Sequence, residues 1–590
     1  MSDAPRSGPE PVFIDFEGID GSGKTTLSNR LADYLRGCGI TVHHARDKGV
    51  FRSEISKAIR TLTRDPRFLR MSDVTELLLY TARDTQMIDE FIRPKLEPGN
   101  VVFSDRYLYS AVTHSHHARG LPRQQVDGVL EMAARGLWPD FVVYCDVDAL
   151  TSRLRKKIQK VKDRRLGEFG RKGLMGIGFR ERMREGFLEL AREDPERWLV
   201  IDNANSTIEE SLQRIFERIK EVLRAKGYGE IPDPRWADPA QLTRGRRPSV
   251  LAGAVKRVLE IRDDDERRDA IGEVFFEEVR RLAETQPAFA ALYVSGVATP
   301  EAHEIRQSIV DTEPALVAHG LQGVRTPESM DFREKLCEVE PVYVARSLSG
   351  MPCEPRAMEL RWKLVDIAPE QIALAVREND LDHAWEIRDH IGKKAPKEVL
   401  VSIRGIDSER AWALRDKRAK EKYFTAFLES LGGLDSERTW EWRDRLSDAY
   451  LPWTLMSLRG LDSDRAWELR RAHVRRAPKI IIKTIGRSDD PRAWELREAA
   501  KYYAKEVLDS LSGLDNSPAW KLRQELRGKW PNTCVSSLGA GAQSPRAWKF
   551  RWEMMGQHPE NLLLMKHLYK SAIRATEDEF VDDEEEDELT

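Results

Sequence analysis

A glycine-rich segment near the start of the chain has the composition of a polyphosphate-binding loop. Residues 13–26 read FIDFEGIDGSGKTT, and the stretch 18–25 matches G-x-x-x-x-G-K-[ST] at every fixed position. Glycines let a backbone curl around an anion with its N–H groups directed inward, and a helix that starts there adds its positive end. The loop predicted to bind ATP comprises Gly18, Ile19, Asp20, Gly21, Ser22, Gly23, Lys24, Thr25 and Thr26.

Two side chains of this loop are predicted to act on the nucleotide directly. Lys24 would neutralise the β- and γ-phosphates, and the Thr25 hydroxyl would be a ligand of Mg²⁺. The predicted cofactors are therefore ATP and Mg²⁺. Such a loop alone specifies nucleotide binding and leaves the reaction open.

Four segments, taken in order, resemble the thymidylate (dTMP) kinase family over about residues 12–223. They read FEGIDGSGKTT (16–26), PGNVVFSDRYLYS (98–110), GLWPDFVVYCDVDALTSRLRKK (136–157) and FRERMREGFLELAREDPERWLVID (179–202). The resemblance implies a nucleoside monophosphate kinase that converts dTMP and ATP into dTDP and ADP. It also implies a possible homodimer formed through the kinase domain.

The same resemblance assigns roles to individual residues. Asp20 would face the sugar of the acceptor nucleotide, Asp105 would join Thr25 in holding the metal, and Arg106 would grip the acceptor phosphate. Phosphoryl transfer needs cations that align the two phosphates, so a basic lid at 153–172 is expected to contribute, through Arg155 or Arg164. The predicted catalytic residues are Lys24, Asp105, Arg106 and Arg164, and the predicted substrate-binding residues are Asp20, Arg46, Tyr80, Arg83 and Arg106.

The acceptor pocket departs from the family pattern. The segment LLYTARD (78–84) keeps an aromatic residue, Tyr80, that can stack on a base, but its last two residues, Arg83 and Asp84, are inverted. One helical position turns a side chain by about 100°, so Asp84 could face the base and favour one that carries an amino group. The loop ARDKGV (45–50) and the residues 113–115 also differ, and the histidines at 114, 116 and 117 are predicted to lie in a polar loop.

These departures keep a second function open, a nucleotide-binding sensor or switch that has lost or changed its acceptor specificity. In that case the helical repeats described below would bind a protein or nucleic acid partner. Under the first hypothesis the repeats serve docking or regulation and have a protein partner.

The elements expected around the loop form an α/β domain at 12–225. Apolar strand patterns at 12–18, 101–105, 141–147 and 198–202 alternate with amphipathic helical patterns, which predicts a parallel sheet flanked by helices. A Pro/Gly/Ser-rich leader (1–11) precedes it and is expected to be disordered, and a linker (226–250) follows it.

Residues 251–576 are predicted to be an all-α solenoid of two-helix repeats about 27 residues long, HEAT-like but assigned to no family. A motif of the type AWxLR recurs with tryptophans at 385, 412, 440, 467, 494, 520 and 548, and the same step leads back to Met358, Met330 and His303. The tryptophans are expected to form the core between repeats. The arginine that ends each motif is expected to be solvated or ion-paired.

Composition narrows the class of protein further. The net charge is -3, and ten acidic residues fall within 577–588, so the tail 577–590 is predicted to be disordered. Apolar runs are too short for a membrane span, and the first residues do not resemble a secretion signal, so a cytoplasmic location is expected. Five widely spaced cysteines favour neither disulfides nor a zinc site.

Overall fold

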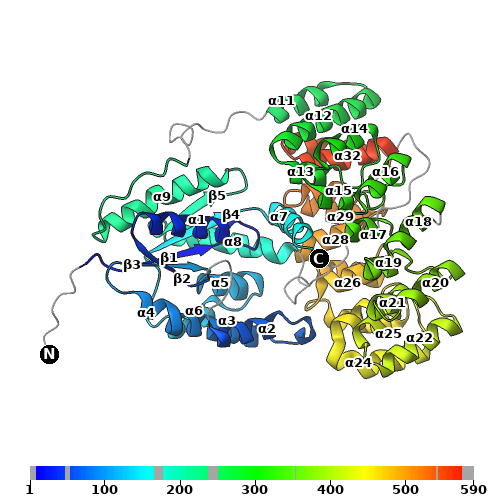
Figure 1. Cartoon of the computed structure of the whole chain (residues 1–590), viewed down its shortest axis with the longest axis horizontal. Helices are drawn as coiled ribbons and strands as arrows, with labels where there is room; N and C mark the ends of the chain where they lie inside the picture. Colours follow the sequence, from blue (N-terminus) through cyan, green and yellow to red (C-terminus); the bar gives the residue numbers. More distant parts are fainter. Residues whose placement is uncertain are drawn as a thin grey trace. The chain divides into compact units, whose positions relative to one another are not determined.

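The computed structural model describes residues 8–46, 53–164, 177–236, 250–352, 354–539 and 542–574. The chain forms two compact units, residues 1–157 with 170–247 and residues 158–169 with 248–590 (Figure 1). The predicted acidic tail, most of the leader and the linker, and the lid residues 165–172 lie outside the described residues. In the described part of the chain, no helix has the length and apolar character needed to cross a membrane.

The first unit is built on a five-stranded parallel sheet in the order β2-β3-β1-β4-β5. Its strands are β1 (Val12–Glu17), β2 (Thr41–His44), β3 (Asn100–Asp105), β4 (Phe141–Asp146) and β5 (Trp198–Asp202). The predicted α/β class and four predicted strands are confirmed. The edge strand β2 was missed because four residues with one aliphatic side chain carry no alternation to detect.

Helices pack on both faces of this sheet, as parallel strands require. On one face, α1 (Lys24–Gly37) and α9 (Ile208–Ala225) bury apolar stripes against Val12, Ile14 and Phe16 of β1. The remaining longer helices of this unit are α2 (Glu54–Arg64), α3 (Asp73–Met87), α6 (Arg123–Ala134), α7 (Ala149–Lys162) and α8 (Ile177–Glu193). Shorter turns are η2 (Pro66–Phe68), η3 (Ile88–Ile92), α4 (Arg93–Lys95), α5 (Tyr109–Val112) and η4 (Thr113–Ala118).

The second unit is an all-α array of two-helix repeats, as predicted, and in most repeats the first helix is longer than the second. After α11 (Val250–Glu260) and α12 (Asp264–Thr285), the longer helices are α14 (Pro300–Ile309), α16 (Pro327–Leu336), α18 (Pro355–Leu364), α20 (Asp382–Ile391), α22 (Glu409–Lys420), α24 (Glu437–Met456), α25 (Asp464–His473), α27 (Pro491–Ala499), α29 (Ser517–Leu526) and α31 (Pro545–Gln557). The second helices are α13 (Pro287–Tyr293), α15 (Pro314–Gly320), α17 (Pro341–Ser347), α19 (Pro369–Ala375), α21 (Pro396–Ser402), α23 (Phe424–Ser430), α26 (Pro478–Ile485), α28 (Ala504–Asp509), α30 (Pro531–Ser536) and α32 (Leu562–Arg574), with a short turn η6 (Lys501–Tyr503) before α28. Helix α24 contains both helices of one repeat, which join at a kink at Tyr450.

The arginine that ends each repeat motif is buried, so the prediction of a solvated or ion-paired residue was wrong. Arg443 is fully buried and donates to the carbonyls of Leu431 and Leu434 at 2.9 and 3.0 Å and to Ser457 Oγ at 2.9 Å. Burial lowers its pKa to about 10, which still leaves it charged at neutral pH. Arginines at the same position are buried in ten repeats: Arg306, Arg333, Arg361, Arg388, Arg415, Arg443, Arg470, Arg497, Arg523 and Arg551.

The tryptophans form part of the inter-repeat core, as predicted. Trp440 is buried, and its indole N–H donates to Asp435 at 2.6 Å. The guanidinium of Arg465, which belongs to the next repeat, lies 4.7 Å from the centre of the Trp440 ring. Each such contact joins neighbouring repeats by cation–π attraction as well as by buried area.

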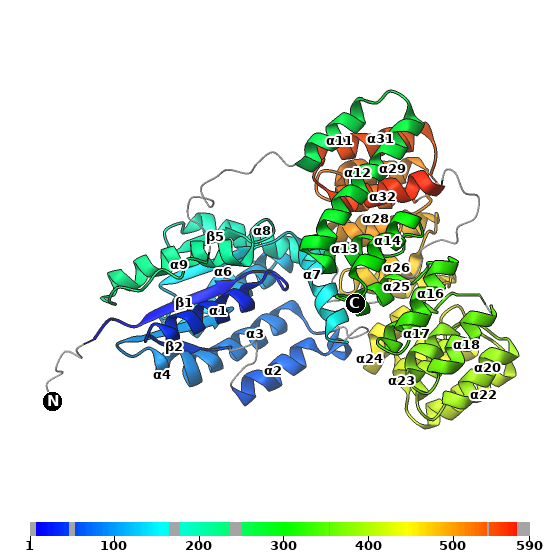
Figure 2. The same ribbon diagram turned by 45° about the horizontal axis from the view of Figure 1, so that its top comes forward.

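The two ends of the array meet. Helix α12 packs against α32, the last helix, in both views of the unit (Figure 1, Figure 2). The Tyr569 ring lies 5.8 Å from Phe275 and 5.0 Å from Phe276, and a Cβ on Gly272 would come within 2.8 Å of Tyr569. Arg268 also covers Trp548 at 4.3 Å. The second unit is therefore a closed ring of repeats.

Candidate functional site

The glycine-rich loop between β1 and α1 has the geometry of an anion cradle. Gly18, Gly21 and Gly23 adopt φ values of +148°, +86° and +93°, which side chains disfavour. A Cβ would approach Cys145 O within 2.7 Å at Gly18 and Asn203 Nδ2 within 2.5 Å at Gly23. The loop backbone is thus free to turn its N–H groups toward a bound phosphate.

Lys24, the first residue of α1, is buried beside this loop. Its ammonium group donates to the carbonyl of Ile19 at 3.3 Å. Burial and the nearby Arg106 charge lower its pKa to about 8. A phosphate group bound at the loop would oppose both effects, so the electrostatics of the site favour an anionic ligand.

Thr25 and Asp105 form a pair that suits a divalent cation. The Thr25 hydroxyl donates to Asp105 Oδ2. The other oxygen, Asp105 Oδ1, is buried and accepts no hydrogen bond from the described residues. Burial would raise the pKa of Asp105, but Lys24, Arg46 and Arg106 hold it below the usual value, so the group is a carboxylate at neutral pH. A hydroxyl and a carboxylate with an unused oxygen are suitable ligands for Mg²⁺.

Arg106 follows β3 directly and reaches the glycine-rich loop. It has φ +80°, an unfavourable conformation for a residue with a side chain, and its N–H donates to Phe16 O at 3.0 Å. The guanidinium donates to Asp20 at 2.5 Å and to Ser110 Oγ at 3.0 Å. Burial opposes its charge, but Asp20 and Glu17 outweigh burial and raise its pKa.

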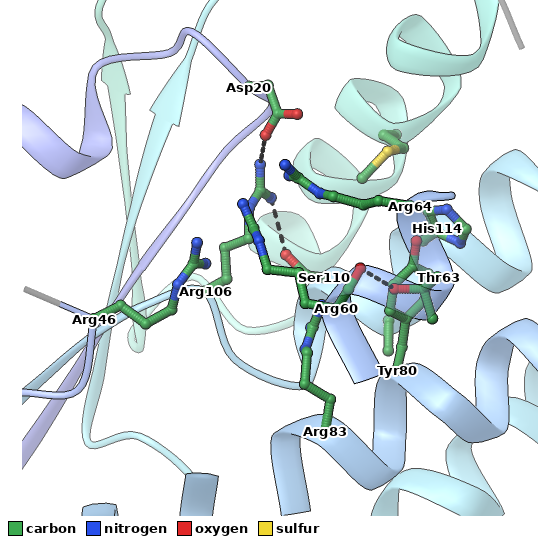
Figure 3. Close-up of a pocket in the computed structure, with 12 residues that line it drawn as sticks. Asp20, Arg46, Arg60, Thr63, Arg64, Tyr80, Arg83, Arg106, Ser110 and His114 are labelled. Atoms are coloured by element: carbon green, nitrogen blue, oxygen red, sulfur yellow. Dashed lines mark hydrogen bonds and ion pairs between the residues drawn. The ribbon is translucent and has the colours of Figure 1, made fainter. Parts of the chain in front are cut away.

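A pocket opens beside Arg106 and includes all five predicted substrate-binding residues (Figure 3). Asp20, Arg46, Tyr80, Arg83 and Arg106 all line it. Arg46 also donates to the carbonyl of Asp105 at 2.8 Å, which connects the pocket to the candidate metal ligand. The sequence prediction therefore selected residues that the fold brings together.

The inverted pair at the end of the LLYTARD segment has a definite geometry. Arg83 donates twice to the neighbouring carboxylate of Asp84, at 2.7 and 2.8 Å, and its guanidinium lies 5.0 Å from the Tyr80 ring. Arg83 lines the pocket, whereas Asp84 is buried and is not among the lining residues. The alternative in which Asp84 takes the base-contacting position is not supported by this arrangement.

Several pocket residues were missed from the sequence. Arg60, Thr63 and Arg64 come from α2, and His114 comes from the π-helical turn η4. The His114 ring lies 4.9 Å from Tyr80, and its Nε2 lies 3.6 Å from Glu76 Oε1, so the polar-loop prediction was wrong. The i, i+4 spacing of Arg60 and Arg64 was a usable signal, because it places both on one helix face.

The two lid arginines lie in different places. Arg155 donates to the carbonyl of Asn203 at 2.7 Å, and Asn203 Nδ2 donates to Ser22 O of the glycine-rich loop at 2.5 Å. Arg164 belongs to the second unit, where its guanidinium lies 3.3 Å from Glu340, and it does not line the pocket. Of the four predicted catalytic residues, Lys24, Asp105 and Arg106 belong to the first unit and Arg164 to the second.

Known proteins match the first unit. The family model for thymidylate kinase matches residues 16–215. The thymidylate kinase of Pelobacter propionicus is 35% identical over 209 residues, which cover 35% of this chain and 93% of that protein. The enzyme of Geobacillus thermodenitrificans is 34% identical over 227 residues, covering 38% and 98%. A crystal structure of thymidylate kinase from Ehrlichia chaffeensis matches with 23% identity, covers 36% of this chain and 99% of that one, and has a TM-score of 0.27.

Proposed function

Because the chain belongs to the thymidylate kinase family, we propose that its first unit transfers the γ-phosphoryl group of ATP to dTMP. The observation that carries this proposal is the position of Arg106. Its guanidinium binds Asp20 of the nucleotide loop while it lines the neighbouring pocket, so one cation lies between the donor and acceptor sites.

In this proposal, different residues bind the donor, orient the acceptor and hold the metal ion. The loop backbone and Lys24 bind the donor triphosphate, and Arg106 and Arg46 orient the acceptor phosphate toward it. Alignment and charge neutralisation account for most of the catalysis of such transfers. Thr25 and Asp105 would hold Mg²⁺, which when bound neutralises charge on the β- and γ-phosphates.

The proposal that dTMP is the acceptor is supported by the hydrogen-bond donors that line the pocket beside Arg106. Tyr80 and the guanidinium groups of Arg64 and Arg83 line the same pocket. Among the described residues that line it, Asp20 is the sole carboxylate, and Arg106 binds it. Hydrogen-bond donors suit the carbonyl oxygens of thymine better than the amino groups of cytosine or adenine.

A nucleotide sensor that lacks acceptor turnover is the second candidate function. It is favoured by the ion pair between Arg83 and Asp84, which occupies a guanidinium that a base could otherwise engage.

We also propose that the kinase unit forms a homodimer through α2, α3 and α6. These helices expose large apolar side chains in the described structure: Ile55 and Leu62 of α2, Val74 and Leu78 of α3, and Met132 of α6. Burial of such groups against a second copy would remove apolar area from water.

The proposed activity is tested with the purified full chain, ATP, Mg²⁺ and a panel of ribo- and deoxynucleoside monophosphates, by measuring the diphosphate product. Formation of dTDP that is lost in Lys24→Ala and Arg106→Ala is the expected result. Lys95→Ala, an exposed residue of α4, is the matched control and keeps the activity. ATP binding without product from any acceptor would instead identify the sensor.

A further inference from the structure

Helix α7 is continuous, but its two halves pack in different units. The boundary between the units falls after Lys157, within the helix. Its first half lies against the nucleotide loop: the Ser152 hydroxyl donates to Asp20 O at 2.5 Å, and a Cβ on Gly21 would come within 2.7 Å of Ser152 O. Its second half belongs to the same compact unit as the ring.

The end of α7 is held by contacts of three kinds. Val161 is fully buried, and its carbonyl accepts a hydrogen bond from Tyr343 Oη at 2.6 Å. The Lys162 ammonium group lies 2.8 Å from Glu313 Oε1, and the Arg164 guanidinium lies 3.3 Å from Glu340. Apolar burial, a backbone hydrogen bond and two ion pairs together define a specific docked segment.

The two glutamates occupy equivalent positions of successive repeats, directly before the proline that begins the second helix. Glu313 precedes α15, and Glu340 precedes α17. In three other repeats the residue at this position is alanine (Ala368, Ala395 and Ala477), and in two more it is uncharged, Gln286 before α13 and Trp530 before α30. Only 11% and 9% of the two glutamate side chains is exposed, so each carboxylate has few alternative partners. The repeat pattern alone does not require these acidic residues, whereas docking of a basic segment does.

We propose that the repeats around α15 and α17 form a docking surface for residues 158–164 of the same chain, and that this docking inhibits the kinase. The inhibitory part rests on the proposed function. Arg164 is one of the two lid arginines, with Arg155, that were predicted to reach the phosphates, and the docked state commits its charge to Glu340. An arginine held by a shielded carboxylate does not stabilise charge on a phosphoryl group in the nucleotide site.

Release of the segment would leave Glu313 and Glu340 without their cations in a poorly solvated place. Such a penalty keeps the docked state the major one, and the free segment becomes a minor population. A ligand or partner that binds the free state would raise turnover by shifting that population. The ring would thereby control whether Arg164 is available to the enzyme to which the ring is attached.

The test compares three full-length proteins: the wild type, the double variant Glu313→Gln/Glu340→Gln, and the control Glu354→Gln/Glu359→Gln. The control changes two exposed glutamates at the start of and within α18, with the same change in net charge. Hydrogen exchange of the amides at 158–164 reports docking directly, and dTDP formation reports inhibition. Tyr343→Phe provides a second release variant, because it removes the hydrogen bond to Val161 and leaves both glutamates in place.

Docking predicts that both release variants exchange these amides about tenfold faster than the wild type, since each lost contact shifts the balance toward the free segment. The control should match the wild type. Inhibition predicts that turnover rises together with exchange. Unchanged exchange in both release variants would overturn the docking surface.

Faster exchange with equal or lower turnover would overturn the inhibitory role and leave the docking intact. If no protein forms product while the exchange still differs, the proposed kinase function fails and the inhibitory role fails with it. In that case the exchange data still establish the docking surface.

Discussion

The guanidinium of Arg106 donates to the carboxylate of Asp20 at 2.5 Å, so the residue that follows β3 is fixed to the nucleotide loop that follows β1. The two strands are neighbours in the parallel sheet, with Phe16 paired to Asp105. Their carboxyl ends therefore place the arginine and the loop at one edge, where ligands of open α/β sheets bind. Arg106 has a φ of +80°, and strained backbone conformations of this kind cluster at functional sites.

Substitution of Asp20 should show how far catalysis depends on the orientation of Arg106 and how far on its charge. Asp20→Asn removes the ion pair but keeps a hydrogen-bonding side chain, so Arg106 remains charged with a less defined orientation. We expect kcat for dTMP to fall by about ten- to a hundredfold, on the scale typical of a lost positioning contact. Steady-state kinetics measures this, and a kcat equal to that of the wild type would contradict it.

Lys24→Met should abolish a proton uptake that accompanies ATP binding. The pKa of Lys24 is about 8 in the ligand-free protein, so at pH 8.5 most of the population is neutral. Bound phosphates favour the ammonium form and raise this pKa, so a proton is taken up at pH 8.5 and very little at pH 6.5. Calorimetry in buffers of different ionisation enthalpy measures the uptake.

The same shift affects the stability of the ligand-free protein. A lowered pKa in the folded state means that the unfolded chain binds more protons between pH 8 and 10.5, so the free energy of unfolding rises with pH in that window. The Lys24→Met variant should lose this rise. An identical pH dependence in both proteins would show that Lys24 is not responsible.

Arg64→Gln should weaken acceptor binding more than ATP binding. Arg64 extends from α2 into the pocket beside Asp20 and Arg106 (Figure 3). Loss of one charged hydrogen bond is worth about 1.5–3 kcal/mol, so KM for dTMP should rise about tenfold or more with little change in KM for ATP. Arg67→Gln changes an exposed arginine in the adjacent turn η2 and serves as the control.

Elements that are specified by residues close together in the sequence could be predicted. The nucleotide loop, four strands and the repeat period depend on neighbouring residues, and even the degenerate copies near Met358, Met330 and His303 proved to be helices with a buried arginine at the motif position. Burial of those arginines was not predictable in this way. It depends on carbonyls that come from residues about 9 to 14 positions away, as in Arg443 with Leu431, Leu434 and Ser457.

Other features depend on contacts between distant parts of the chain. Closure of the ring brings Tyr569 against Phe275, nearly the whole array apart in sequence, and no local pattern indicates it. The pair of Arg83 and Asp84 was visible in the sequence, but which of the two would line the pocket depended on the tertiary environment of α3.

Arg443→Met should destabilise the ring strongly, although methionine keeps an unbranched apolar stem at this position. Methionine cannot donate to the buried carbonyls of Leu431, Leu434 and Ser457, so these groups lose their partner at a cost of about 3–5 kcal/mol. Arg445→Met lies on the same helix, α24, at an exposed position and should change stability by about 0.5 kcal/mol or less. Hydrogen exchange of the α23 and α24 amides measures the difference, and equal protection in the two variants would argue against a structural role for the buried arginines.

Val74→Glu/Leu78→Glu should convert a dimer of the chain into a monomer. Val74 and Leu78 are one helical turn apart on α3, and the two residues are 51% and 48% exposed. A negative charge at each position would be buried without a partner in the proposed dimer, which is strongly unfavourable, whereas in the monomer both remain in water. The control is Ile367→Glu/Leu381→Glu in the ring unit, where the exposed fractions are 59% and 61%. Sedimentation velocity should give a dimer for the wild type and the control and a monomer for the α3 variant; a monomeric wild type, or an α3 variant that remains dimeric, would exclude this surface.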